Sequence, residues 1–184
     1  MCAWSFQNPS KTKPCLRTIV IATEGTVTEP EYFSQLNSMK KSANFIIVPN
    51  YGNGSDPTKV LERMKKYLQE NALDESDEAW IVIDQDKWTK EQMAEVEAWC
   101  SENLIQHHIA VSKKKFEHWL KLHTKGDKKS EKKYNHLLTG RDKHIPDGFI
   151  TKKRVLDAIQ KAKNLAPTAK SVGNVYELIE KFFS

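Results

Sequence analysis

Two short apolar runs limit the fold of this chain more than any other feature of its sequence. They are "TIVIAT" at Thr18–Thr23 and "AWIVI" at Ala79–Ile83, and neither alternates apolar with polar residues as a half-exposed strand does. Strands with both faces buried have this pattern, and they occur in parallel sheets that helices cover on each side. We therefore predict that both runs are buried strands of a parallel sheet.

Further strands and helices are predicted in alternation with these runs. "FIIV" at Phe45–Val48 and "IAV" at Ile109–Val111 are short β-branched runs, and the segments between strands carry apolar residues at the spacing of one helical face. Capping arrangements mark three helix starts: Thr28 with Glu31, Asp56 before Pro57, and Thr89 with Gln92. The order strand-helix-strand predicts an α/β fold, a Rossmann-like four-stranded parallel sheet flanked by helices.

The tail of the chain is predicted to be mainly helical. One helix is expected to begin near Phe116, and two more lie around Val155 and around Leu178. The stretch Lys125–Lys133 is rich in lysine and has no apolar residue, which is typical of a mobile loop. We therefore expect an N-terminal extension at 1–17, a catalytic domain at 18–124, and a basic loop with C-terminal helices at 125–184 that pack on the same domain.

Composition argues against a membrane or secreted protein and locates the positive charge. No run approaches the roughly 18 apolar residues of a membrane helix, the start lacks the layout of a secretory signal, and three scattered cysteines are typical of reduced thiols. A cytoplasmic location is expected. The net charge is +5, and the stretch Lys113–Lys133 alone holds nine lysines and three acids. This local charge indicates either a polyanionic partner or a solvated loop.

Acidic residues follow directly after the two buried strands. Glu24 and Gly25 come after the first, and Asp84 and Asp86 end the second in "AWIVIDQD". Ligands of parallel sheets bind at the carboxyl ends of the strands, so we expect three carboxylates to converge if these strands are neighbours. Carboxylates brought together repel one another, and a hard divalent cation such as Mg²⁺ relieves that repulsion. A lone D-x-D pair would more often begin a turn, but the added Glu-Gly favours a metal site.

This combination of acids resembles the Toprim domain, which topoisomerases, primases and OLD-family nucleases share. Five motifs together resemble the RloB family of small Toprim-type proteins of bacterial defence loci: "EGTVTEPEYF", "GSDPTKVLERM", "IVIDQD", "FEHWLKLH" and "NVYELIEKF". The resemblance runs from about Thr18 to the C-terminus. It implies a Toprim-type fold with a C-terminal helical extension.

The resemblance also implies roles for particular acids. Glu24 would be a metal ligand or general acid/base, and Asp84 and Asp86 would bind Mg²⁺ or Mn²⁺. Glu29 and Glu117 would be further acidic members of the site. Glu29 is alternatively an acid in the first turn of a helix, where it would complement the helix dipole, and Glu117 is alternatively an exposed acid at the start of a helix.

The chain departs from its relatives next to these acids. Relatives tend to carry Arg inside D-x-D and an acid after it, where this chain has Gln85 and Lys87. Before Phe116 this chain has Lys113, Lys114 and Lys115 in place of an Asn-Pro-small stretch. We expect Lys87 and these three lysines to contact nucleic acid.

The implied activity is hydrolysis of a phosphodiester bond. Strand passage and primer synthesis need further domains that 184 residues can hardly contain. A metal-dependent nuclease acting on DNA or RNA in anti-phage defence, such as abortive infection, is therefore the leading hypothesis. The alternative is a catalytically silent subunit that binds nucleic acid or a partner. Relatives often lie beside a gene for an ATPase, so an ATPase partner is expected under either hypothesis.

Overall fold

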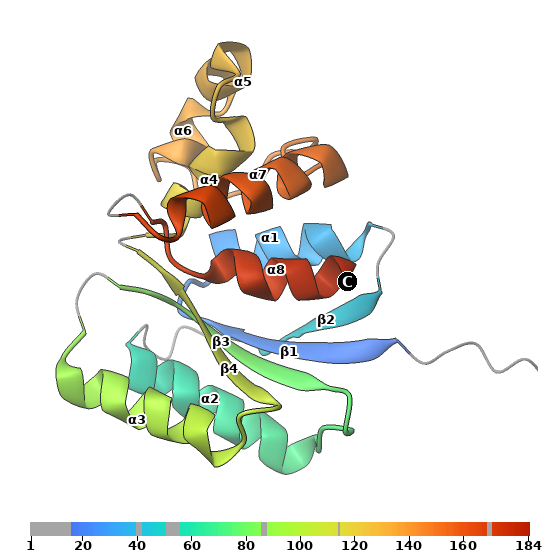
Figure 1. Cartoon of the computed structure of the whole chain (residues 1–184), viewed down its shortest axis with the longest axis vertical. Helices are drawn as coiled ribbons and strands as arrows, with labels where there is room; N and C mark the ends of the chain where they lie inside the picture. The colour runs from blue at the N-terminus through green and yellow to red at the C-terminus, as the bar shows by residue number, and fades with distance from the viewer. Residues whose placement is uncertain (1–15, 40–41, 51–55, 86–87, 114, 169–170) are drawn as a thin grey trace, which may run out of the picture.

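The computed structural model describes residues 16–39, 42–50, 56–85, 88–113, 115–168 and 171–184 (Figure 1). Within these residues the strands form one parallel sheet in the order β2-β1-β3-β4. The strands are β1 (Arg17–Thr23), β2 (Ala43–Ile47), β3 (Glu78–Asp84) and β4 (His107–Ser112). The predicted four-stranded parallel α/β fold with a C-terminal helical part is confirmed, and the two buried runs are the central strands.

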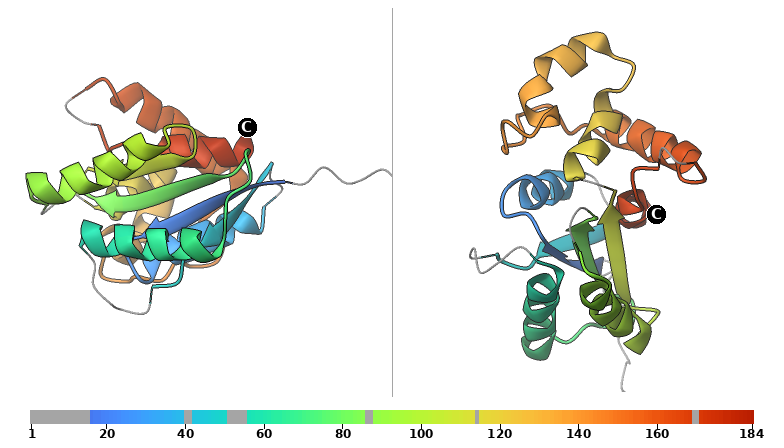
Figure 2. Two further views of the ribbon diagram at one scale, coloured as in Figure 1. Left: turned by 90° about the horizontal axis from the view of Figure 1, so that it is seen from below. Right: turned by 90° about the vertical axis from the view of Figure 1, so that its left-hand side faces the viewer.

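Helices cover both faces of the sheet (Figures 1 and 2). One face carries α2 (Pro57–Glu70) and α3 (Lys90–Glu102), and the other carries α1 (Thr28–Asn37) and α8 (Val175–Phe183). A further layer stacks beyond α1 and α8, and it contains α4 (Phe116–Thr124), α5 (Lys128–Lys133), α6 (Asn135–Leu138) and α7 (Lys152–Leu165). Among the described helices, none is long and apolar enough to cross a membrane.

The central strands lack alternation because each face of the sheet has its own apolar core. In β1, Ile19 and Ile21 pack toward α1 and α8, while Val20 and Ala22 pack toward α2 and α3. The core on the α1 and α8 side continues into the outer layer and takes in Phe149 and Val155 there. The segment after residue 124 therefore shares a core with the sheet.

The structure confirms two predicted helix caps and corrects one. The Asp56 side chain accepts from the backbone N–H groups of the first turn of α2, and Thr89 forms a capping box with Gln92. Thr28 does not cap α1, since it lies inside the helix and its hydroxyl donates to the Lys143 carbonyl at 2.8 Å. The Thr28 hydroxyl, which the sequence spacing predicted to cap the helix, therefore binds a loop that is distant in the sequence.

The lysine-rich stretch after α4 also differs from the mobile loop that its composition predicts. Part of it is the helix α5, which Asp127 caps by accepting from the backbone N–H groups of Lys129 and Ser130. Arg154 donates to the Ser130 hydroxyl at 2.8 Å and lies over the Tyr134 ring. These polar contacts order a helix that has no apolar stripe of its own.

The segment before α8 extends the sheet at the edge strand β4. Gly173 pairs with Ser112 in an antiparallel bridge, and the Lys113 backbone N–H donates to the Val172 carbonyl at 3.0 Å. The Asn174 side chain accepts from the Val111 N–H at 2.7 Å and donates to the Ile109 carbonyl at 3.1 Å. The C-terminal part thus fixes the carboxyl end of β4, where the lysines begin.

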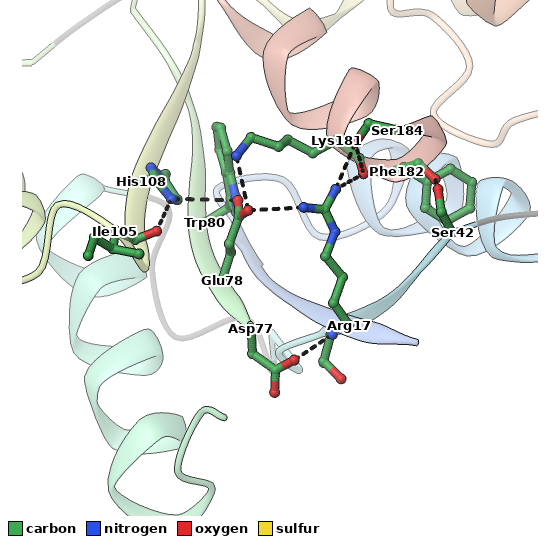
Figure 3. Close-up of polar contacts among 11 residues, drawn as sticks. Arg17, Ser42, Asp77, Glu78, Trp80, Ile105, His108, Lys181, Phe182 and Ser184 are labelled. Carbon is green, nitrogen blue, oxygen red and sulfur yellow. Dashed lines mark hydrogen bonds and ion pairs between the residues drawn. The ribbon is translucent and has the colours of Figure 1, made fainter. Parts of the chain in front are cut away.

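A buried carboxylate ties the amino ends of the strands to α8 (Figure 3). Glu78, which is 6% exposed, accepts from Lys181 at 3.0 Å, from the Trp80 indole N–H at 2.8 Å and from Arg17 at 3.4 Å. The His108 Nε2 atom lies 3.5 Å from the Glu78 Oε2 atom. Burial lowers the pKa of His108, although the charge of Glu78 opposes this effect. This cluster closes the end of the sheet that lies opposite the predicted site.

We expect Glu78→Gln to lower the free energy of unfolding by about 2 kcal/mol, because two cations lose their carboxylate. The loss should stay below the roughly 3–5 kcal/mol of a fully buried pair, since Arg17 and Lys181 reach solvent. Urea denaturation measures it. The matched control is Glu62→Gln, which breaks the exposed pair with Lys59 and should lower the free energy of unfolding much less than Glu78→Gln does. Equal losses in the two variants would contradict the structural role of Glu78.

Candidate functional site

Adjacent parallel strands bring Glu24 and Asp84 to one edge of the sheet. Thr23 pairs with Val82, and the Glu24 backbone N–H donates to the Val82 carbonyl at 2.9 Å. The Glu24 carboxylate accepts from the Asp84 backbone N–H at 2.9 Å. The prediction that these acids follow neighbouring strands therefore agrees with the geometry, and both are half-buried.

A cavity of about 440 Å³ opens at this edge. Its walls are the loop from Glu24 to Thr28, the first turns of α1 and α4, the end of β3, and Lys143 from the loop after α6. Four acidic and two basic side chains line it: Glu24, Glu29, Asp84, Glu117, Lys115 and Lys143. We call it the carboxylate cavity.

Glu29 is a buried acid in the first turn of α1, with 8% of its surface exposed. Burial raises its pKa from the ordinary 4.5 to about 7, and the charges of Glu117 and Glu24 add to the increase, while Lys143 opposes it. A β-carbon on Gly25 would lie 1.9 Å from the Glu29 Oε2 atom. Gly25 therefore makes room for this carboxylate.

Glu117 occupies the corresponding place in the first turn of α4. Lys143 donates to its Oε1 atom at 2.8 Å. Burial alone would raise the pKa of Glu117, but the hydrogen bond and the charges of Lys143 and Lys115 outweigh it, so the pKa is lowered. A β-carbon on Gly140, whose φ is +72°, would lie 2.7 Å from the same oxygen. The two neighbouring acids thus have pKa values moved in opposite directions.

Lys143 is a site residue that the sequence analysis missed. Its loop is held against α1, since Thr28 donates to the Lys143 carbonyl and Glu31 accepts from the Ile145 N–H at 2.7 Å. The hydrogen bond to Glu117 raises the pKa of Lys143, and the charges of Glu29 and Asp84 add to the increase. No periodicity in the sequence marks this lysine, because a contact between distant segments places it.

The remaining predicted residues divide into two groups. Lys115 is exposed and lines the carboxylate cavity, whereas Lys113 is exposed and lies where β4 meets the Val172 segment. Asp86, Lys87 and Lys114 lie outside the described residues.

The described acids surround a common cavity without forming a ready coordination sphere. Within the described part of the chain, no three His, Cys, Asp or Glu side chains are positioned together to hold a metal ion. Glu24 is engaged with a backbone N–H, and Glu117 with Lys143. Lys143 supplies part of the positive charge that balances the negative charge of these acids.

The fold and the cavity define a class: parallel α/β proteins with a cluster of acids at the carboxyl edge of the sheet. Residues 19–182 match the family model described as RloB-like protein. The chain therefore belongs to the RloB-like family. Neither the curated proteins nor the solved structures include a match to it.

The raised pKa of Glu29 predicts how stability changes with pH. The folded state binds the proton more tightly than the unfolded chain, so this stabilisation is full below about pH 4.5 and is lost as the pH rises to about 7. The loss amounts to about 3 kcal/mol. Glu29→Gln should remove it, so unfolding measured without metal between pH 5 and 7.5 should show a flatter pH dependence.

The control for this prediction is Glu91→Gln. Glu91 also lies in the first turn of a helix, but it is exposed and its pKa is lowered, mainly by a hydrogen bond to its own backbone N–H. The Glu91→Gln variant should leave the pH dependence of unfolding between pH 5 and 7.5 unchanged. If Glu29→Gln also leaves it unchanged, Glu29 is ionised in the folded protein at pH 6.

Proposed function

We propose that this protein is a metal-dependent nuclease that hydrolyses phosphodiester bonds of DNA or RNA. The observation that carries the proposal is the carboxylate cavity, where four acids and two lysines meet at the carboxyl edge of a parallel sheet. Such edges are the usual ligand sites of α/β proteins. Membership in the RloB-like family supports the same conclusion.

The cavity fits Mg²⁺ or Mn²⁺ in charge and in donor type. Carboxylate oxygens are the ligands that hard divalent cations prefer, and acids outnumber lysines on its walls. Glu24, Asp84 and Asp86 would hold the cation, with Glu29 and Glu117 as further candidates. When bound, the cation would supply the charge that activates water and stabilises the leaving oxygen.

The chain's own residues have separate parts in this proposal. Glu24, whose carboxylate accepts from the Asp84 backbone N–H, would take a proton at the end of β1. Lys143 and Lys115 line the side of the cavity nearest α4, where ammonium groups would bind the phosphates of a substrate. Gly25 and Gly140 leave room for the two buried carboxylates.

The biological setting is part of the same proposal. We place the activity in the bacterial cytoplasm, in defence against phage, with an ATPase encoded nearby as the partner that controls it. This assignment rests on the resemblance to defence-associated relatives.

We expect Asp84→Asn and Asp86→Asn each to abolish cleavage, and Glu24→Gln to reduce it about 100-fold or more if Glu24 transfers the proton. The assay incubates the purified protein with mixed DNA and RNA pools in Mg²⁺ or Mn²⁺ and maps the cut ends. Glu75→Gln is the control, because Glu75 is an exposed acid that precedes β3, at the end of that strand opposite Asp84. Full activity in both aspartate variants would remove the metal-dependent mechanism.

The hydrogen bonds that already engage two of the cavity's acids favour a second candidate function, because Glu24 accepts from the Asp84 backbone N–H and Glu117 from Lys143. In it, the protein binds nucleic acid or an ATPase partner and does not cleave. Isothermal titration with Mn²⁺ separates the two, since a silent subunit would bind no metal at the cavity. Metal binding that Asp84→Asn abolishes would support the nuclease.

The lysines of the cavity predict the salt dependence of nucleic-acid binding. If Lys115 and Lys143 each neutralise one phosphate, replacing both by Ser should flatten the plot of log affinity against log salt by about 1.4 to 1.8 units. Binding is measured in Ca²⁺, which we expect not to support hydrolysis. Lys59→Ser on α2 is the control and should not change the slope. An unchanged slope in the double variant would mean that the phosphates bind elsewhere.

A further inference from the structure

The carboxylate cavity is the first of three cavities that follow one another along α4. Lys115, Glu117 and Lys143 also line a smaller cavity of about 130 Å³. That cavity shares His118, Lys121, Leu138 and Thr139 with a third, of about 440 Å³. The three cavities are therefore neighbours, and they follow one another from the acids toward the end of α4.

The third cavity, which we call the α4–α6 pocket, differs in chemistry from the first. Its apolar walls are Leu122, Leu138, Leu165 and Val172, of which the first two are buried. Exposed polar groups stand at its rim, among them Asn135 and Thr139. A cavity of this volume with apolar walls and a few polar groups is typical of a site for a small organic ring with a hydrogen-bonding edge.

Basic residues mark the path between the two larger cavities. His118 and Lys121 lie on one face of α4, Lys115 and Lys125 flank the two ends of the helix, and all four line the two cavities beside it. Lys143 stands beside the same path at the carboxylate cavity. A line of positive charge leading from an acidic site to an apolar pocket is complementary to a phosphate backbone that carries a base.

We propose that the α4–α6 pocket binds one unpaired base of a single-stranded nucleic acid whose phosphate lies at the carboxylate cavity. This inference rests on the proposed function and adds the class of substrate. The base must be unpaired because a base inside a duplex is stacked and reaches a pocket between helices only after it is flipped out, which costs free energy that a single strand does not require. The basic residues beside α4 hold the backbone, and the apolar walls hold the ring.

The geometry of α4 sets the distance between the two sites. The pocket is centred about six residues along the helix from Lys115, which is about 9 Å at 1.5 Å per residue. At roughly 3.4 Å per stacked nucleotide, the bound base lies two or three nucleotides from the phosphate at the acids.

The test is an abasic scan. Oligonucleotides of single-stranded RNA and DNA, each with one base removed at successive positions from the cleavage site, are bound to the full protein in Ca²⁺. We expect one position, two or three nucleotides from that site, to weaken binding about tenfold or more. The two sets of oligonucleotides show whether the pocket takes ribonucleotides, deoxyribonucleotides or both.

Leu165→Trp is designed to fill the pocket and should abolish the effect of that one position. Leu156→Trp is the matched control, since Leu156 is an exposed leucine on the same helix and lies outside the pocket walls. Lys121→Ser leaves the packing intact and should flatten the salt dependence by about one unit. It keeps the test decisive if the tryptophan variant fails to fold.

The outcomes separate this inference from the nuclease proposal. A scan with no sensitive position, an unchanged scan in folded Leu165→Trp, or equal binding of duplex and single strand would each overturn the pocket. If the protein cleaves no substrate, the bases of one oligonucleotide of fixed sequence are removed one at a time, and binding is measured in the same way. A single sensitive position that Leu165→Trp removes would then support the pocket while the nuclease proposal fails.

Discussion

The hydrogen-bonded ladder between β1 and β3 is the interaction on which the rest of this structure depends. Its register fixes where each strand ends, and Glu24 continues the ladder for one more residue before its carboxylate meets the Asp84 N–H. A slip of one residue would turn the apolar side chains of a strand toward the wrong face of the sheet. The two cores that stabilise the sheet therefore also hold the acids in place, although no acid contributes to either core.

Several small features of the chain offset the electrostatic repulsion among the acids at this edge. Glu29 and Glu117 each stand in the first turn of a helix, where the helix dipole favours negative charge. Each carboxylate also lies against a glycine, and Lys143 reaches across from a loop that α1 holds. The balance is uneven, because the hydrogen bond from Lys143 lowers the pKa of Glu117, whereas burial raises the pKa of Glu29.

Local patterns predicted what depends on local chemistry. The strands, α2 with its Asp56 cap and α3 with its Thr89 capping box follow from apolar runs and neighbouring polar residues. Lys143 could not be predicted in this way, because 26 residues separate it from Glu117 and only tertiary contacts bring the two together. The same contacts explain the error at Thr28, whose hydroxyl binds the Lys143 carbonyl. Helix α5 was missed because capping and Arg154 stabilise it in the absence of an apolar face.

The position of α8 has a consequence for the order in which the protein is made. Phe182 stacks on Phe45 of β2, and the residues just before α8 complete the edge beside β4 where the lysines begin. α8 is the last of the described elements along the chain, so the face that it shares with α1 is only partly covered until α8 has been made. A nascent chain without this segment thus lacks the contacts that fix the carboxyl end of β4.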